Sequence, residues 1–202
     1  MPKIIDHEKR RDEILRRAFA LFSRQGYQNT SLSNLADVCH ISRPTLYLYF
    51  KDKEELFRYA LKHFTDSMLK DYKGIAEISG STYADKIEKI CIDIIAKSYR
   101  NSDFVQSLAD FIIQMRHQGE DVTDAILRRT VKLKYLFSQL MTEAIKQGEL
   151  EPVPVREAVN QLLSLIQAMM FQIILVGPEN EKEAIRTVSF FLGNIRAKGP
   201  GQ

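Results

Sequence analysis

Residues 30–56 read TSLSNLADVCHISRPTLYLYFKDKEEL. The hydroxyls of Thr30 and Ser31 can each accept a hydrogen bond from a free N–H at the start of a helix, so either residue can cap a short helix through the apolar residues that follow. A tight turn comes next, and Ser42 can cap a second short helix, predicted over residues 44–50. The stretch therefore predicts two short helices joined by a tight turn.

The start of the second short helix has residue types that can read a nucleic acid. If this helix enters a major groove with its N-terminus first, Arg43, Pro44 and Thr45 are the side chains able to meet base edges. Donors for backbone phosphates follow directly in the sequence: Tyr47, Tyr49, Lys51 and Lys53. This order of residues predicts contact with bases first and with the phosphate backbone beyond them.

Each of these side chains also has a purely structural alternative. Tyr47 has apolar neighbours, so its alternative is a place in the core. For Tyr49 and Lys53 the alternative is a surface position without a role in binding. Leu48 offers only apolar contact, such as contact with a thymine methyl group.

The arrangement resembles the TetR family of bacterial transcriptional repressors. Family members commonly read G-Y/F-x-x-T-S/T-V/L-x-x-I/L-A and then V-S-x-x-T/L/S-L/I/F-Y-x-Y/H-F-x-S/N/D-K-x-x-L. The matching features here are the helix EKRRDEILRRAFALFSRQGY at residues 8–27, then Thr30-Ser31-Leu32, Leu35-Ala36, Ile41-Ser42, Thr45-Leu46-Tyr47, Tyr49-Phe50, Lys53 and Leu56. Nearly every marked position agrees, and a helical pattern alone would not fix the aromatic residues.

By this resemblance, the second short helix is a recognition helix whose first three residues contact bases and adjacent phosphates. Two tyrosines of this helix and a lysine beyond it are expected to bind backbone phosphates. Thr30 takes a family position that caps the preceding helix and often reaches a phosphate. The predicted DNA-binding residues are Thr30, Ser31, Arg43, Pro44, Thr45, Tyr47, Leu48, Tyr49 and Lys53.

The rest of the chain reads as helices. Apolar residues recur at spacings of three and four, and no run alternates convincingly with period two, so we predict an all-α protein without a sheet. Gly26 is predicted to stop the first helix. The D-x-x-E capping pattern of Asp52 and Glu55 opens a long helix that ends near Tyr72, before a loop over residues 74–80. Further helices are predicted at about 82–100, 103–117, 121–147, 155–176 and 181–197.

The resemblance divides this helical chain into two domains. Residues 1–52 are expected to form an N-terminal three-helix helix-turn-helix DNA-binding domain. Residues 53–202 are expected to form a helical ligand-binding and dimerisation domain. The long helix over 53–72 would then link the two.

Two C-terminal helices are predicted to join two subunits. Residues 158–178 contain no charged residue, yet they include Asn160, Gln161, Ser164, Gln167 and Gln172, so a helix buried in protein explains them better than a membrane span. A helix that is apolar almost all round must be buried on every side. We therefore predict a homodimer through helices 155–176 and 181–197, with Phe191 or Leu192 facing the partner.

The middle helices, from about residue 82 to 147, are expected from the resemblance to enclose a cavity for a small-molecule effector. Aromatic and methionine walls with a few amides suit an apolar or amphipathic molecule. The alternative for each of these residues is plain core. The predicted ligand-binding residues are Phe64, Met68, Tyr99, Phe111, Met115, Gln167 and Phe171.

Composition and charge agree with a regulator that binds DNA in the cytoplasm. Residues 1–53 hold ten Lys and Arg against six Asp and Glu, whereas the rest of the chain is nearly neutral, so an anionic partner is expected at the N-terminal end. The two cysteines form no CxxC, the histidines share no metal-ligand spacing, and no glycine-rich phosphate loop, GxSxG or HExxH is present. We therefore predict no metal, no cofactor, no membrane partner and no enzymatic activity.

The function predicted from these observations is ligand-responsive regulation of transcription. The simplest form is a repressor that a small molecule releases from a palindromic operator in double-stranded DNA. One alternative is a small-molecule-binding or protein-interaction module that no longer reads DNA. An activator with the same fold is another.

Overall fold

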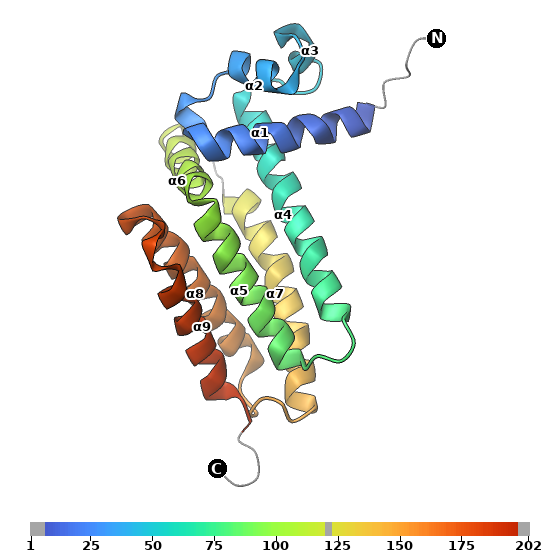
Figure 1. Cartoon of the computed structure of the whole chain (residues 1–202), viewed down its shortest axis with the longest axis vertical. Coiled ribbons are helices and arrows are strands. Elements are labelled where there is room, and N and C mark those ends of the chain that lie inside the picture. Colours follow the sequence, from blue (N-terminus) through green and yellow to red (C-terminus); the bar gives the residue numbers. More distant parts are fainter. Residues whose placement is uncertain (1–6, 120–122, 198–202) are drawn as a thin grey trace. The chain divides into compact units, whose positions relative to one another are not determined.

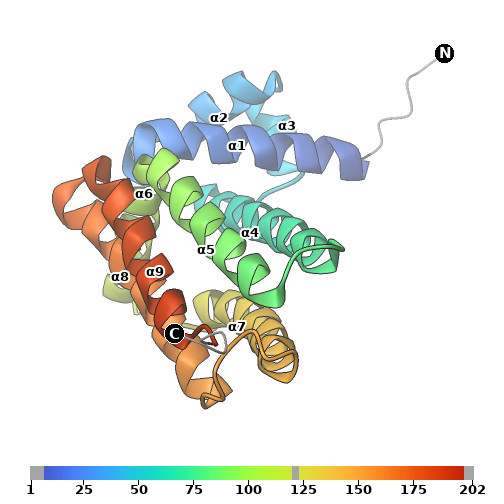
Figure 2. The same ribbon diagram turned by 60° about the horizontal axis from the view of Figure 1, so that its bottom comes forward.

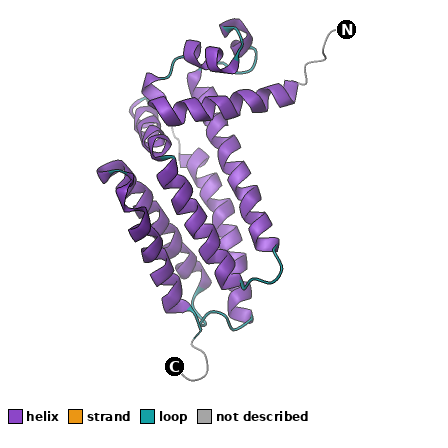
Figure 3. Cartoon of the chain, in the orientation of Figure 1, coloured by secondary structure: helices purple, strands orange, loops and turns teal. Residues whose placement is uncertain are grey.

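The computed structural model describes residues 7–119 and 123–197, and these residues form helices without a strand (Figure 3). An isolated antiparallel bridge joins Leu150 to Arg196. The all-α prediction is therefore confirmed. The helices are α1 (His7–Asn29), α2 (Leu32–Cys39), α3 (Arg43–Tyr47), α4 (Lys53–Glu77), α5 (Tyr83–Arg100), α6 (Ser102–His117), α7 (Thr123–Lys146), α8 (Val155–Val176), the 3-10 helix η1 (Pro178–Asn180) and α9 (Glu181–Ile195).

Two helix ends differ clearly from the prediction. Helix α3 ends at Tyr47 rather than Phe50. Helix α4 passes through Gly74 and ends at Glu77, so most of the predicted loop over 74–80 is helical. A glycine costs an α-helix only about 1 kcal/mol, and the apolar residues beyond Gly74 extend the helix despite it. In α1 the regular helix stops at Gly26 as predicted, because the backbone there is non-helical, and one further turn follows the kink up to Asn29.

The chain packs as two compact units. One consists of Met1–Met68 with Asp103–Glu120, and the other of Leu69–Ser102 with Asp121–Gln202. Helix α4 belongs to both, since the division falls within it. Helix α6 packs with the N-terminal helices although it lies far along the sequence. The predicted boundary between residues 52 and 53 separates a DNA-binding domain from a ligand-binding and dimerisation domain, and this functional division stays a prediction.

An aromatic cluster joins α1, α4 and α6 in the first unit. The Phe57 ring of α4 lies 4.9 Å from Phe22 of α1 and 4.6 Å from Phe111 of α6, between ring centroids. Tyr27 completes the cluster at 5.0 Å from both Phe57 and Phe111. The buried hydroxyl of Ser107 donates a hydrogen bond to the Phe22 carbonyl at 3.2 Å. These contacts make α6 part of the core on which the N-terminal helices rest.

Gly26 allows the turn that places Tyr27 in this cluster. Its backbone angles are φ 78° and ψ 163°, a region that is essentially restricted to glycine. A Cβ atom at this position would meet Ser107 Oγ at 3.6 Å, which is ordinary van der Waals contact. The requirement for glycine therefore comes from the backbone and not from crowding.

Gly26→Ala is expected to destabilise the protein by about 1–3 kcal/mol, because alanine must adopt this backbone conformation. Chemical denaturation followed by circular dichroism measures the change. Gly74→Ala is the matched control: it lies inside α4 with no atom within 4 Å of the added Cβ. The control should be stabilising by about 0.5–1 kcal/mol. Equal stability of Gly26→Ala and wild type would show that the kink is not strained for alanine.

Helix α5 is central to the second unit and contacts α7, α8 and α9. In Figures 1 and 2, α8 and α9 lie side by side along α5. The fully buried residues at its centre are Ile87, Ile90, Cys91 and Ile95 of α5, Phe137 and Met141 of α7, Val159 and Leu162 of α8, and Val188 and Leu192 of α9. Arg196 Nη2 then fastens the end of α9 to α5, donating to Asp85 at 2.8 Å and to Glu88 at 2.9 Å.

Candidate nucleic-acid interface

Side-chain caps define α2 and α3. The Ser31 hydroxyl accepts from the backbone N–H of Asn34 at 3.1 Å, while the Asn34 side-chain oxygen accepts from the Ser31 N–H at 3.2 Å. This reciprocal pair satisfies free donors at the start of α2. The Ser42 hydroxyl accepts from the Thr45 N–H at 3.2 Å, with proline in the first turn of α3. The predicted caps at Ser31 and Ser42 are confirmed.

Thr30 does not cap α2, and that prediction is wrong. Its side chain is only 1% exposed, and its hydroxyl donates to the Gly26 carbonyl at 2.7 Å. Thr30 and Ser31 are both good cap residues, but Ser31 is the cap, while Thr30 bonds back to the residue at the kink, Gly26. Because its hydroxyl is buried and already bonded, we do not keep Thr30 among the proposed DNA contacts.

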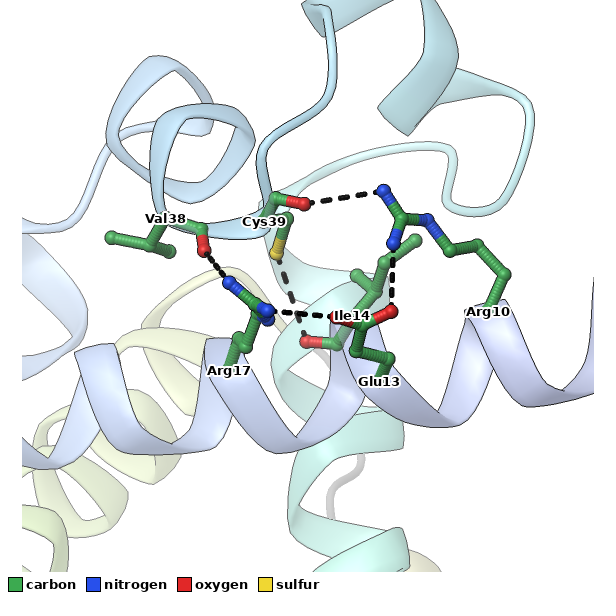
Figure 4. Close-up of polar contacts among 6 residues, drawn as sticks. All are labelled: Arg10, Glu13, Ile14, Arg17, Val38 and Cys39. Atoms are coloured by element: carbon green, nitrogen blue, oxygen red, sulfur yellow. Dashed lines mark hydrogen bonds and ion pairs between the residues drawn. The ribbon is translucent and has the colours of Figure 1, made fainter.

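Two arginines of α1 hold the C-terminal end of α2 (Figure 4). Arg17 Nη1 donates to the Val38 carbonyl at 2.8 Å, and Arg10 Nη2 donates to the Cys39 carbonyl at 3.4 Å. The last carbonyls of a helix have no hydrogen-bond donors within the helix, and here the two arginines supply these donors. The Glu13 carboxylate lies between the two guanidinium groups and accepts from Arg10 at 2.7 Å and from Arg17 at 2.8 Å.

These charges act within the protein. The hydrogen bond from Arg10, with help from Arg17, lowers the pKa of Glu13, so this carboxylate stays ionised. Burial raises the pKa of Cys39 to about 11, so its sulfur remains a thiol. In the sequence, Arg10 and Arg17 stand out only as positive charges. Their spacing of three and four residues from Glu13 was the signal that could have revealed the network.

Helix α3 presents an exposed face and a buried one. Leu46 is 2% exposed and Phe50 1%, and these two side chains anchor the segment. Tyr47 is 49% exposed and Leu48 83%, so the core alternative for Tyr47 is wrong. Arg43 and Pro44 are also exposed. The outward face therefore combines a guanidinium, a phenol and two apolar side chains.

Three of the predicted DNA contacts, Thr45, Tyr49 and Lys53, already have partners within the protein. Lys53 Nζ donates to the Tyr27 carbonyl at 2.9 Å and lies 4.3 Å from the centre of the Tyr27 ring. Burial lowers the pKa of Lys53. The Tyr49 hydroxyl lies 3.3 Å from Nδ1 of His7. Thr45 Oγ1 lies 2.8 Å from the Ser42 hydroxyl.

The start of α4 is capped as predicted. Asp52 Oδ1 accepts from the Glu55 N–H at 2.8 Å, and Glu55 Oε2 accepts from the Lys51 N–H at 2.6 Å. Since Lys53 also contacts Tyr27, this N-terminus is fixed to α1. Residues 30–56 thus form two short helices and the start of a third, each held by side-chain bonds.

Comparison with known proteins identifies this arrangement. The family model described as "Bacterial regulatory proteins, tetR family" matches residues 14–60, which include α2, α3 and the start of α4. The resemblance to the TetR family is confirmed over this N-terminal segment. The chain is a DNA-binding transcriptional regulator and not an enzyme, as its sequence predicts.

Relatives extend this likeness beyond the matched segment. The uncharacterised HTH-type transcriptional regulator YfiR of Bacillus subtilis is 27% identical over 151 residues, which are 72% of this chain and 70% of YfiR. The HTH-type transcriptional repressor ComR of Escherichia coli is 42% identical over 65 residues, which are 32% of this chain and 29% of ComR. A TetR regulator structure from Haloarcula marismortui has the same fold, with a TM-score of 0.79, 16% identity, and coverage of 94% of this chain and 99% of that one.

The predicted ligand residues of this regulator do not all lie in one unit. Phe111 and Met115 are buried in the first unit, where Phe111 belongs to the aromatic cluster. Phe64 stacks on Phe19 at 4.1 Å, in the same unit as the half-buried Met68. The second unit holds the other three residues: buried Tyr99, exposed Gln167 and Phe171, which is 57% exposed on α8.

Two surface hollows have other linings. One is lined by Gln28, Asp110, Ile113, Gln114, His117 and Gln118. The other is lined by Ile75, Asp85, Glu88, Lys89, Ile92, Asp93 and Ala96. None of the seven predicted ligand residues lines either hollow. Within the described part of the chain, no group of three or more His, Cys, Asp or Glu side chains could hold a metal ion.

Helices α8 and α9 of the regulator expose a set of large apolar side chains. These are Phe171 (57% exposed), Ile174 (37%), Leu175 (65%) and Val176 (64%) of α8, and Phe190 (72%) of α9. Helix α8 is long and apolar enough to cross a membrane by length and composition alone, and 28% of its most apolar window is buried. The polar residues noted above, such as Asn160 and Gln172, lie along it.

Phe191 or Leu192 is predicted to face a partner, and of these two Leu192 cannot, because it is buried within its own subunit. Leu192 is 2% exposed and lies in line with Ala184 and Val188, which are 1% and 0% exposed. Residues at this spacing share one face of a helix, and in α9 that face is turned to the core of its own subunit. Phe190 projects on the other side of α9, while Phe191 is half-buried between the two.

Proposed function

We propose that this regulator is a cytoplasmic repressor that binds a palindromic operator as a homodimer and is released by a small molecule. The observation that carries the proposal is the exposed face of α3, on which Arg43, Pro44, Tyr47 and Leu48 project while Leu46 anchors the helix. A short helix with apolar and cationic residues projecting from a fixed core suits insertion into a major groove.

Each exposed residue of α3 has a proposed task. Arg43 can donate two hydrogen bonds to O6 and N7 of a guanine, and Leu48 can contact a thymine methyl group. Pro44 and Thr45 lie beside Arg43 at the tip of the helix and contact bases or the adjacent backbone. The remaining proposed contacts are to phosphates: Ser31 at the exposed start of α2, Tyr47, Tyr49 and Lys53.

A homodimer is proposed because the DNA-reading part of one subunit, the short helix α3, here called the reading head, is small. One five-residue helix makes few base contacts, and a stable specific complex needs two heads on two half-sites. The exposed apolar side chains of α8 and α9 support a dimer interface there, because contiguous apolar patches on soluble proteins mark interaction sites. The two recognition helices would then lie about 34–36 Å apart, one turn of DNA.

The effector site is proposed for the second unit, which holds Tyr99, Gln167 and Phe171 of the residues predicted from the sequence. Tyr99 supports a polar contact in it, because its buried hydroxyl has no hydrogen-bond partner among the described residues. Burial raises the pKa of Tyr99, with the carboxylates of Glu181 and Glu183 adding to the effect. The hydroxyl therefore stays protonated and can donate to an effector.

Release requires the effector to prefer a state in which the heads no longer fit successive grooves. Tilting of α4, which runs from the helix-turn-helix into the second unit, would produce this misfit. A 100-fold loss of DNA affinity requires about 2.7 kcal/mol of coupling. The repressor role agrees with ComR, whose name describes it as a repressor.

A mobility-shift titration tests the proposal. The protein is titrated against DNA from upstream of its own gene and against a shuffled duplex of equal length. We expect the upstream DNA to bind about 10³-fold or more tightly than the shuffled duplex, as specific sites do. Adding an apolar extract of the native cell should dissociate the specific complex. Equal affinity for the two duplexes would contradict a regulator that reads an operator at its own gene.

A further inference from the structure

The first residue of α1 meets the segment that follows α3. His7 and Tyr49 are 42 positions apart in sequence, yet His7 Nδ1 lies 3.3 Å from the Tyr49 hydroxyl. Their ring centroids are 6.0 Å apart and the planes are tilted by 41°. His7 is exposed and Tyr49 half-buried, so the shared hydrogen bond lies at the protein surface.

One turn further along α1, Arg11 packs against Phe50 of the same segment and against Tyr59 of α4. The Arg11 guanidinium carbon lies 5.2 Å from the Phe50 ring centre and 4.2 Å from that of Tyr59. Phe50 is 1% exposed, so the residue next to Tyr49 is fixed in the core. The N-terminal part of α1 therefore packs against this segment through Arg11, while His7 contacts its half-buried tyrosine, Tyr49.

The direction of the hydrogen bond decides what the tyrosine can do. A phenol has one hydrogen to donate. If Tyr49 donates it to a bare Nδ1, that hydrogen is unavailable to a phosphate. If His7 carries a hydrogen on Nδ1, the histidine donates to the phenol oxygen and leaves the O–H of Tyr49 free. A phosphate oxygen only accepts, so bound DNA favours the second arrangement.

We propose that His7 is a positioning residue for DNA binding, which donates from Nδ1 to the Tyr49 oxygen and directs the Tyr49 O–H to a backbone phosphate. Hydrogen bonds in such a chain polarise and strengthen one another. This inference rests on the proposed DNA contact of Tyr49. It adds to that contact a residue outside the helix-turn-helix.

A double-mutant cycle on the operator tests this role. The variants are His7→Ala, Tyr49→Phe, the double variant, and His7→Asn, whose side-chain amide nitrogen stands where Nδ1 of histidine does. Fluorescence anisotropy at several salt concentrations gives the affinity and its salt dependence. Thermal unfolding of every variant is compared with wild type, and because His7 is exposed at a helix end, all should fold.

We expect His7→Ala to weaken operator binding by about 5- to 160-fold, since each of two subunits loses one hydrogen bond of roughly 0.5–1.5 kcal/mol. In the Tyr49→Phe background, His7→Ala should alter the affinity less than about twofold. If the two residues acted independently, the loss would be the same in both backgrounds. His7→Asn should stay near wild type. The slope of log K against log salt should not change, because no charged phosphate contact is removed.

Two results would overturn the positioning role while leaving the proposed function intact. An equal loss from His7→Ala in both backgrounds would mean that His7 acts independently of Tyr49. A lower salt slope in His7→Ala would mean that the histidine binds a phosphate as a cation. Failure of wild type to prefer its operator over a shuffled duplex would instead overturn the proposed function and this inference together.

Discussion

Phe190→Glu is expected to convert the regulator from a dimer to monomers at micromolar concentration. Phe190 is 72% exposed in the single subunit, so the change should not disturb the subunit's own core. In the proposed interface the new carboxylate would be buried without a counter-ion, at several kcal/mol, and two-fold symmetry applies this cost twice. Sedimentation velocity measures the dimer fraction, and circular dichroism checks that the monomer remains folded.

Two further variants separate loss of the interface from general damage. Tyr135→Glu places the same charge on an equally exposed aromatic residue, 65% exposed on α7, and should remain dimeric. Leu192→Glu buries a charge in the subunit's own core and should unfold the second unit. If Phe190→Glu sediments as a folded dimer with normal operator affinity, the interface does not include this part of α9.

Arg43→Ala is expected to weaken operator binding by about 1–3 kcal/mol per half-site and to relax the preference at one base pair. Arg43 is the only residue of α3, RPTLY, with a long charged donor. The measurement compares affinities for the operator and for duplexes with single base-pair changes. In wild type one position should strongly prefer guanine, and in Arg43→Ala that preference should be lost.

Arg100→Ala is the matched control, since Arg100 is an exposed arginine on α5. It should bind the operator as wild type does. If Arg43→Ala weakens binding to every duplex by the same factor, Arg43 contacts a phosphate and does not read a base.

The parts of the fold that sequence could predict are those set by local patterns. Hydrophobic spacing gave the helices, because each helix buries one apolar stripe. Cap residues placed the starts of α2, α3 and α4, with Ser42 and Asp52 in the predicted roles. The docking of α6 on α1 and α4 could not be predicted, because it depends on long-range contacts such as that between Phe57 and Phe111.

The errors in the candidate sites have the same origin. Thr30 and Ser31 are both suitable caps by residue type, and only the structure shows that Ser31 is the cap while Thr30 bonds to the Gly26 carbonyl. Helix α9 has apolar residues on two faces, so its sequence could not indicate which face packs inside the subunit. The structure places Leu192 inside and Phe190 outside. The exposed face of α3, in contrast, could be predicted from the sequence. Leu46 and Phe50 are four residues apart and share the buried side, which leaves the other residues exposed.

The central claim is that two α3 helices of one dimer read two related half-sites. Selection of binding sites from random-sequence DNA by the wild-type protein, followed by sequencing, tests this most directly. We predict an inverted repeat whose half-site centres are about 10–10.5 base pairs apart or a multiple of that distance. Recovery of no enriched sequence, or of a single half-site without its inverted copy, would contradict the account.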